Sequence, residues 1–159
     1  MPISINPPLL LMGVAPERYS HELIAGTKEF VVNVPTIEIV KEMLFCGRKT
    51  GKEHDKFKET GLTLLPAKTV RPPIIKECVA HLECKLYQQI SMGDHTLFVG
   101  EVLTTYVNEG VFLDNKFNLK KVKLIYMHAC TGKGRGPRWI HILYGRRTCR
   151  LQNRSNYRR

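Results

Sequence analysis

The stretch that decides the fold is Val79–Val107, VAHLECKLYQQISMGDHTLFVGEVLTTYV. In its first half, apolar and polar side chains alternate with the period of two expected of a β-strand with one buried face. Met92–His95 (MGDH) predicts a turn, and Thr96–Val107 is a second run rich in β-branched and aromatic residues. The stretch therefore predicts a long antiparallel hairpin. The apolar face of its first strand comprises Ala80, Leu82, Cys84, Leu86 and Ile90, with Gln88 as its single polar member.

Shorter elements flank this hairpin. The continuous apolar run Leu9–Val14 predicts a strand that is buried on both faces. Short helices are predicted at about 16–25, where a proline opens the helix and a glycine ends it, and after Thr36. The sequence therefore predicts a mainly β (α+β) domain with short helices, arranged as a barrel. The other predicted segments are strands at Phe30–Val34, Leu62–Leu65 and Lys121–Tyr126, and a helix around Glu53–Glu59.

Charge divides the 159-residue chain into two parts. The whole chain has 25 Lys+Arg against 14 Asp+Glu, a formal net charge of +11 that by itself suits a nucleic-acid or anionic-surface binder. Residues 1–126 hold every acidic residue and carry only +2, whereas residues 127–159 carry +9, mostly as arginine. The charge pattern therefore predicts one near-neutral domain over 1–126 and a separate basic tail over 127–159.

The sequence gives little support to several other classes of protein. It has no apolar run of the length that a transmembrane span needs, and Met1–Ser4 does not resemble the start of an export signal. The five cysteines are odd in number and scattered, which favours reduced thiols and a cytoplasmic location. Cys78, His81 and Cys84 have a metal-like spacing, but in a strand an offset of three turns His81 to the opposite face. We therefore expect no metal site, and no nucleophile–base pair has a recognisable local signature.

Two features leave alternatives open. The loop Gly47–Lys52 (GRKTGK) has the composition of a phosphate cradle, but Glu53 stands where a P-loop needs Ser or Thr. It is either an exposed basic loop or a site that binds an anionic cofactor through backbone N–H groups and a hydroxyl. His95 is either a plain turn residue or, in a cleft, a group that binds a ligand or carries a proton.

Four stretches within residues 4–126 together resemble the flavin reductase-like family of FMN-binding split β-barrels, which includes flavoredoxins and the reductase components of two-component monooxygenases. The stretches keep the family's order and approximate spacing. The resemblance implies an antiparallel split β-barrel with short helices, of the FMN-binding type, assembled as an obligate homodimer with FMN near the subunit interface. The stretches are Pro7–Leu9 with Glu17–Ile24, then Glu29–Pro35, then Cys46–Gly51 with Asp55–Phe57 and Thr60–Leu62, and finally Gly93–Val102.

The resemblance also implies a reaction and a site. In such proteins NAD(P)H donates a hydride to the flavin and the electrons pass to an acceptor or a monooxygenase partner, while the protein supplies position and electrostatics. His95 would be the catalytic residue that orients the nicotinamide. Six residues would lie in or near the cofactor-binding region: Thr50, Gly51, Lys56 and Phe57 within it, and Arg18 and Ser20 beside it, where they could help with phosphate or the interface.

The chain departs from the family pattern in two places. Family members carry about one further hairpin before the segment that matches Ser4–Leu11, so we expect the barrel to be incomplete at its N-terminus. Residues 127–159 show no resemblance, and we expect them to be disordered or to derive from a shifted reading frame. The alternative for this tail is a basic arm that binds nucleic acid or anionic lipid.

The function expected is therefore that of an FMN-binding oxidoreductase of the flavin reductase type. The alternatives are a non-catalytic FMN-binding electron carrier of the same fold and, less favoured, a basic-tailed nucleic-acid-binding protein.

Overall fold

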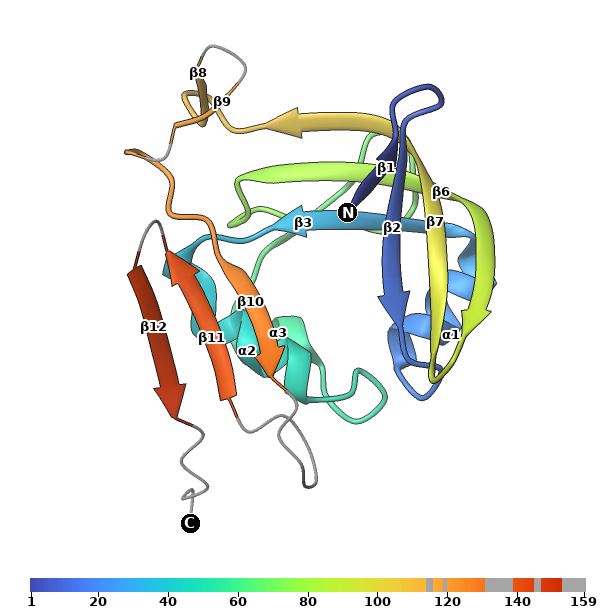
Figure 1. The fold of residues 1–159 in the computed structure, drawn as a ribbon, viewed down its shortest axis with the longest axis horizontal. Helices are drawn as coiled ribbons and strands as arrows, with labels where there is room; N and C mark the ends of the chain where they lie inside the picture. Colours follow the sequence, from blue (N-terminus) through green and yellow to red (C-terminus); the bar gives the residue numbers. More distant parts are fainter. Residues whose placement is uncertain (114–115, 119, 131–138, 145–146, 153–159) are drawn as a thin grey trace.

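The structure is a computed structural model that describes residues 1–113, 116–118, 120–130, 139–144 and 147–152. Its main feature is a curved antiparallel sheet of five strands in the order β1-β2-β7-β6-β3 (Figure 1). The predicted hairpin is confirmed, because β6 and β7 meet at Met92 and His95, with Gly93 at the φ of 60° that the turn requires. The strands are β1 (Pro2–Ser4), β2 (Leu9–Val14), β3 (Glu29–Val34), β6 (Ala80–Met92) and β7 (His95–Val107).

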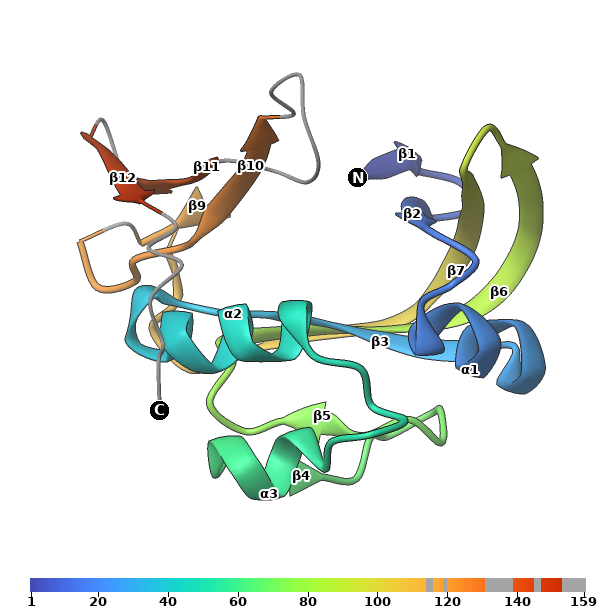
Figure 2. The same cartoon turned by 90° about the horizontal axis from the view of Figure 1, so that it is seen from below.

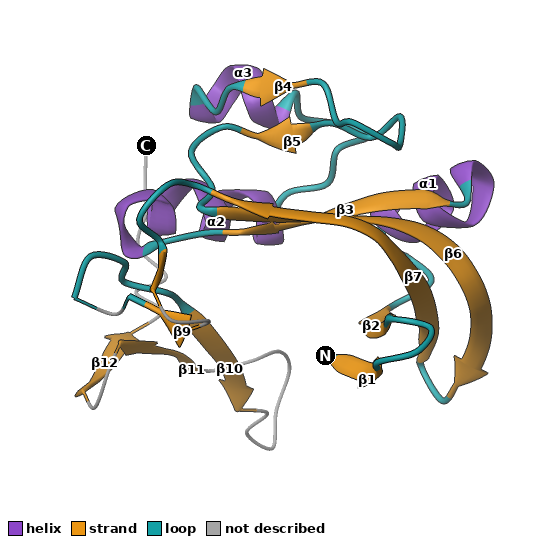
Figure 3. Ribbon diagram, turned by 90° about the horizontal axis from the view of Figure 1, so that it is seen from above, coloured by secondary structure: helices purple, strands orange, loops and turns teal. Residues whose placement is uncertain are grey.

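The long hairpin joins the two ends of the barrel. β3 pairs only with residues 80–85 of β6, and β2 pairs only with residues 96–101 of β7. On either side of the point where these regions meet, the β6–β7 register shifts once, at Glu83/Cys84 and at Leu86/Gln88. Such irregularities bend and twist a sheet. The hairpin accordingly curves from the β3 layer round to β2 and β1, which leaves an open, split barrel (Figure 3).

The remaining elements lie around this sheet. α3, β4 and β5 lie on one side of the β3-β6-β7 layer, and β1 and β2 lie on the other (Figures 2 and 3). Among the described residues no helix is long and apolar enough to cross a membrane. These elements are α1 (Tyr19–Thr27), η1 (Ile37–Ile39), α2 (Val40–Arg48), α3 (Lys56–Thr60), β4 (Leu64–Leu65), β5 (Ile74–Ile75), β8 (Phe112–Leu113) and β9 (Lys116–Phe117).

A small apolar core joins α1 to the sheet. Its buried members are Leu10, Ile24, Phe30, Cys84 and Phe98, drawn from β2, α1, β3, β6 and β7. On β7, Gly100 faces the Phe30 ring so closely that a Cβ at this position would overlap it. The glycine therefore lets α1 and β3 pack closely on the hairpin.

Two burial predictions were wrong. β2 was expected to be buried on both faces, but only Leu10 is buried, because the residues of β2 border two open cavities instead of packing beneath another layer. β6 was expected to bury one face, but His81 and Glu83 on its polar face are also buried, at 2% and 0% exposure. Glu83 bonds to Lys68 and Thr69 of the connection between β4 and β5, which accounts for burial on this second face.

The predicted strand at Lys121–Tyr126 is also absent, since only Leu124 forms a bridge there, to Thr36. A strand begins instead at Tyr126. β10 (Tyr126–Cys130), β11 (Trp139–Tyr144) and β12 (Arg147–Gln152) form a separate three-stranded antiparallel sheet. The described part of segment 127–159 therefore contains strands, although its lack of resemblance to the family led us to expect disorder or a shifted reading frame. The run WIHILY in β11 has the composition that strands favour. The division of the chain at residue 126 stays a prediction.

Candidate functional site

The larger of two cavities in the described part of the chain lies beside the barrel and has a volume of about 940 Å³. Its walls come from the end of β2, the first turns of α1, and the connection from α2 to α3. The volume falls in the range of ligand pockets, roughly 300–1,000 Å³. The cavity brings together six of the seven residues that the sequence assigned to a site: Arg18, Ser20, Thr50, Gly51, Lys56 and Phe57.

The first turn of α1 supplies one wall. Arg18 is the N-cap residue, with an extended backbone and no side-chain capping bond, and Ser20 lies in the first turn. The exposed N–H groups and the positive end of the helix dipole lie at this end of α1. The guanidinium of Arg18 and the hydroxyl of Ser20 add further donors, so this wall can hold an anion.

The opposite wall is a tight loop that begins at Thr50. The carbonyl of Thr50 accepts hydrogen bonds from the amides of Glu53 (3.3 Å) and His54 (3.2 Å). Its Oγ1 accepts from the amide of Lys52 at 3.3 Å, which leaves the hydroxyl proton for donation to a ligand. At Gly51, a Cβ would lie 3.0 Å from Cδ1 of Tyr19. A side chain here would require the Tyr19 ring or the loop to shift by a few tenths of an ångström, so glycine allows the close contact between the loop and α1.

Lys56 fixes the far end of this loop. Its Nζ donates to the carbonyl oxygen of Cys46 at 2.6 Å, in the last turn of α2, where a cation is favourable. Asp55 caps α3 by accepting a hydrogen bond from the amide of Lys58 at 3.2 Å. Burial raises the pKa of the Cys46 thiol, which therefore stays protonated at neutral pH. Lys56 thus has a structural role and keeps its other N–H donors for a ligand.

His95 lies apart from the other predicted site residues. It begins β7, its ring is half-exposed, and Nδ1 makes a 2.7 Å hydrogen bond with Oδ1 of the neighbouring Asp94. That bond is the main reason why the pKa of Asp94 is lowered. The structure does not place His95 among the residues that line the cavity. It does lie near Gly13, which lines the cavity and whose Cβ would be 4.0 Å from the imidazole Cδ2.

Two residues at the site, Tyr19 and Glu22, were given no role from the sequence, whereas Lys52 belongs to the loop Gly47–Lys52 that the sequence singled out. Tyr19 lines the cavity, Glu22 bonds to Lys52 at 2.6 Å, and the Nζ of Lys52 lies 5.4 Å from the centre of the Tyr19 ring. Tyr19 and Glu22 are three residues apart, so they share one face of a helix. In the sequence, this spacing indicates that Tyr19 and Glu22 lie on one face of the helix. It does not show that this face meets the loop.

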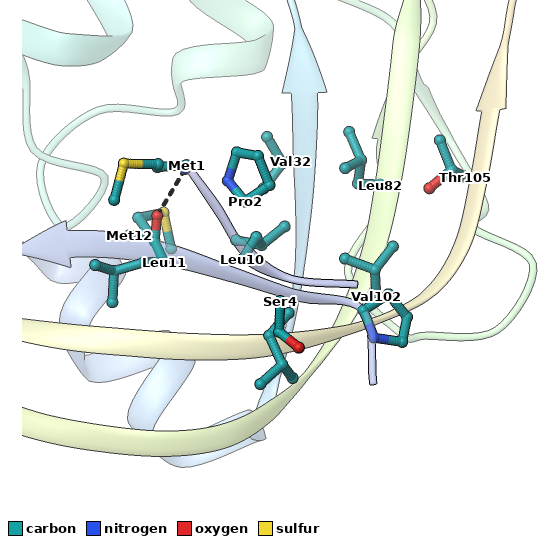
Figure 4. Close-up of a pocket in the computed structure, with 12 residues that line it drawn as sticks. Met1, Pro2, Ser4, Leu10, Leu11, Met12, Val32, Leu82, Val102 and Thr105 are labelled. Atoms are coloured by element: carbon teal, nitrogen blue, oxygen red, sulfur yellow. Dashed lines mark hydrogen bonds between the residues drawn. The ribbon is translucent and has the colours of Figure 1, made fainter. Parts of the chain in front are cut away.

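A second, smaller cavity of about 440 Å³ is an apolar groove inside the open barrel (Figure 4). The N-terminal amine of Met1 donates to the carbonyl of Leu11 at 2.9 Å and holds β1 along β2. Side chains of Leu10, Val102 and Leu82 line the groove from three strands. Ser4 and Thr105 supply its polar side chains, so its chemistry differs from that of the large cavity.

A model of the flavin reductase like domain matches residues 1–129. The chain belongs to this family. The resemblance inferred from the four stretches is confirmed, and so is the split β-barrel fold. An uncharacterized protein of Archaeoglobus fulgidus is 44% identical over 136 residues, which is 84% of this chain and 73% of that protein.

Two further relatives bear on function. The crystal structure of a flavoredoxin from Methanosarcina acetivorans has a TM-score of 0.73 at 30% identity, covering 80% of this chain and 68% of that one. An NADH-dependent FAD reductase of Streptomyces globisporus is 31% identical over 105 residues. That match covers 64% of this chain and spans 56% of the reductase.

Proposed function

We propose that this flavin reductase-like chain is an FMN-binding oxidoreductase, with NAD(P)H as hydride donor and a further acceptor for the electrons. The observation that carries the proposal is the large cavity, which gathers anion-binding groups of α1 and the Thr50 loop around one space. Family membership and the named activity of the Streptomyces globisporus relative support it.

The residues of the cavity fit a flavin mononucleotide, which has a flat ring system and an anionic phosphate. Apolar side chains of Met12, Val14 and Leu23 line one part of the space, as a ring system needs. Arg18 and Lys49 add positive charge, as a phosphate needs. Bound flavin would supply the ability to accept a hydride and pass on its electrons.

The chain's own residues would then bind and orient. Arg18 and Ser20, at the N-terminal end of α1, hold the anionic group. Thr50 donates its hydroxyl proton, and the Lys56 bond to Cys46 keeps the loop in place. His95, beside Gly13, orients the nicotinamide at the edge of the cavity.

The test is to mix the purified protein with FMN and then with NADH. A bound flavin absorption band that bleaches on addition of NADH supports the proposal. A bound band that bleaches only with dithionite favours the electron carrier instead. If no flavin binds, and the protein binds DNA or RNA in a salt-sensitive way, both flavin functions are excluded.

We also propose that the protein is a homodimer in which the apolar groove of Figure 4 meets a second copy. β1 is the edge strand of the sheet, and Met1, Ile3 and Ile5 beside the groove are exposed. An open strand edge next to exposed apolar side chains is a template for pairing, and a second copy offers the same edge. Light scattering after size exclusion should show a dimer that Ile3→Glu dissociates. The matched control Leu64→Glu, on exposed β4 across the sheet, should leave it intact.

A further inference from the structure

We propose that Tyr19 and Glu22 of α1 are positioning residues that hold the Thr50–Lys52 loop against the cavity and thereby set the rate at which flavin leaves. This inference rests on the proposed function, because it concerns flavin in the large cavity. Neither residue needs to contact the flavin's reactive ring.

Two successive loop residues touch the same helix. The Nζ of Lys52 forms an ion pair with Oε2 of Glu22 at 2.6 Å and lies 5.4 Å from the centre of the Tyr19 ring. The hydrogen bond to Glu22 is the main reason why the pKa of Lys52 is raised. Gly51 approaches the same Tyr19 ring so closely that a Cβ would be 3.0 Å from it. The side of the loop next to α1 is therefore held by one ion pair and one aromatic ring.

The two ends of the loop are held unequally. At the α3 end, Lys56 donates to the carbonyl of Cys46 at 2.6 Å in a half-buried position. At the α1 end, the side chains of Lys52 and Glu22 are 58% and 62% exposed. Exposed ion pairs are weak and are screened by salt, so this contact is the one that yields first. The loop can therefore swing away from α1 while its other end stays attached to α2.

This asymmetry matters because the cavity lies between α1 and the loop. Tyr19 and Ser20 form one wall, while Thr50 and Gly51 form the other. Separation of the two walls widens the opening and removes Thr50 from a ligand. The Glu22–Lys52 pair then acts as a salt-sensitive latch on ligand release.

The test measures the dissociation rate of FMN from the loaded protein, by the recovery of free-flavin fluorescence on dilution, at low and high NaCl. Glu22→Gln should raise this rate about two- to fivefold at low salt, the effect expected from loss of an exposed ion pair. The difference from wild type should vanish at high salt, where the pair is screened. Lys52→Arg, which keeps the charge, should restore most of the wild-type rate relative to Lys52→Gln.

Glu29→Gln is the matched control. Glu29 is also paired, with Arg71 at 3.0 Å, but neither residue lines the cavity. The proposal is overturned if Glu22→Gln leaves the rate unchanged at low salt, if the effect persists at high salt, or if Glu29→Gln gives the same increase. If wild type binds no FMN, the proposed function fails and no dissociation rate can be measured. Amide exchange of residues 50–53 then tests the latch alone, which is supported by faster exchange in Glu22→Gln than in Glu29→Gln and refuted by equal rates.

Discussion

Glu83 is a buried carboxylate that holds the connection between β4 and β5 against β6, and its replacement tests this packing directly. The residue has 0% exposure. Its carboxylate accepts hydrogen bonds from the amides of Lys68 (2.8 Å) and Thr69 (2.6 Å), from the Thr69 hydroxyl, and from the Tyr106 hydroxyl at 3.0 Å. Every one of these bonds favours the charged form of Glu83.

The size of the effect follows from the pKa of Glu83. Burial by itself raises this pKa, but the four hydrogen bonds outweigh burial and lower it from 4.5 to about 2. At about 1.4 kcal/mol per pKa unit, the difference corresponds to ~3 kcal/mol of folding stability. Because the pKa is depressed in the folded state, this stabilisation is fully present above about pH 4.5 and is lost as the pH falls toward 2.

Glu83→Gln keeps the shape of the side chain but replaces an acceptor oxygen with an NH₂ group that faces other donors. We expect a loss of ~3 kcal/mol near neutral pH, or a fall in Tm of about 6–12 °C. Urea unfolding should show the wild-type advantage shrinking as the pH falls below about 4.5. Glu109→Gln, which removes an equal charge from an exposed position, should change stability by less than about 0.5 kcal/mol. A loss under about 1 kcal/mol for Glu83→Gln, or a difference that is constant with pH, would refute the reasoning.

Three further substitutions test the site and the core. His95→Ala should slow NADH-driven reduction of bound FMN while FMN affinity in a fluorescence titration changes little; an unchanged rate removes its proposed role. Gly51→Val should weaken FMN binding by about tenfold, because its Cβ would lie 3.0 Å from the Tyr19 ring and force the loop outward. Gly100→Ala should lower the free energy of unfolding by ~1–3 kcal/mol, because its methyl group overlaps the Phe30 ring; a neutral result in urea would show that the ring yields at no cost.

Local patterns predicted the strands better than they predicted burial. The alternation in Val79–Val107 was sufficient to predict the hairpin, because period, turn residues and β-propensity all agree there. The burial of His81 and Glu83 was not predictable, because it depends on a connection that folds back over β6 from residues 66–79. His81 is held by the side-chain oxygen of Asn33, on another strand and 48 positions away. A polar residue on a strand therefore cannot be assigned to solvent until its neighbours in space are known.

The site residues were predictable only in part, because the contacts that assemble them join segments that are distant in the sequence. The resemblance gathered six residues that do line one cavity, although no local pattern joined the α1 segment to the Thr50 loop. The Glu22–Lys52 ion pair joins positions 30 apart, and only the fold brings them together. His95 was assigned by position in a motif, yet its nearest polar partner is Asp94 and not a cavity residue.

The contrast between the two cavities is the physical reason for proposing the larger one as the site of an anionic cofactor. The apolar groove offers two hydroxyl side chains and the N-terminal amine, one of whose hydrogens is bonded to the carbonyl oxygen of Leu11, but no arginine and no helix N-terminus. A phosphate moved there would lose its hydration without gaining comparable hydrogen bonds, which is strongly unfavourable. The cavity between α1 and the Thr50 loop supplies Arg18, a helix N-terminus and a free hydroxyl donor. Because the groove is lined mainly by apolar side chains, contact with another apolar surface is the favourable way to remove it from water. The proposed second copy of the chain would supply that surface without occupying the proposed flavin site.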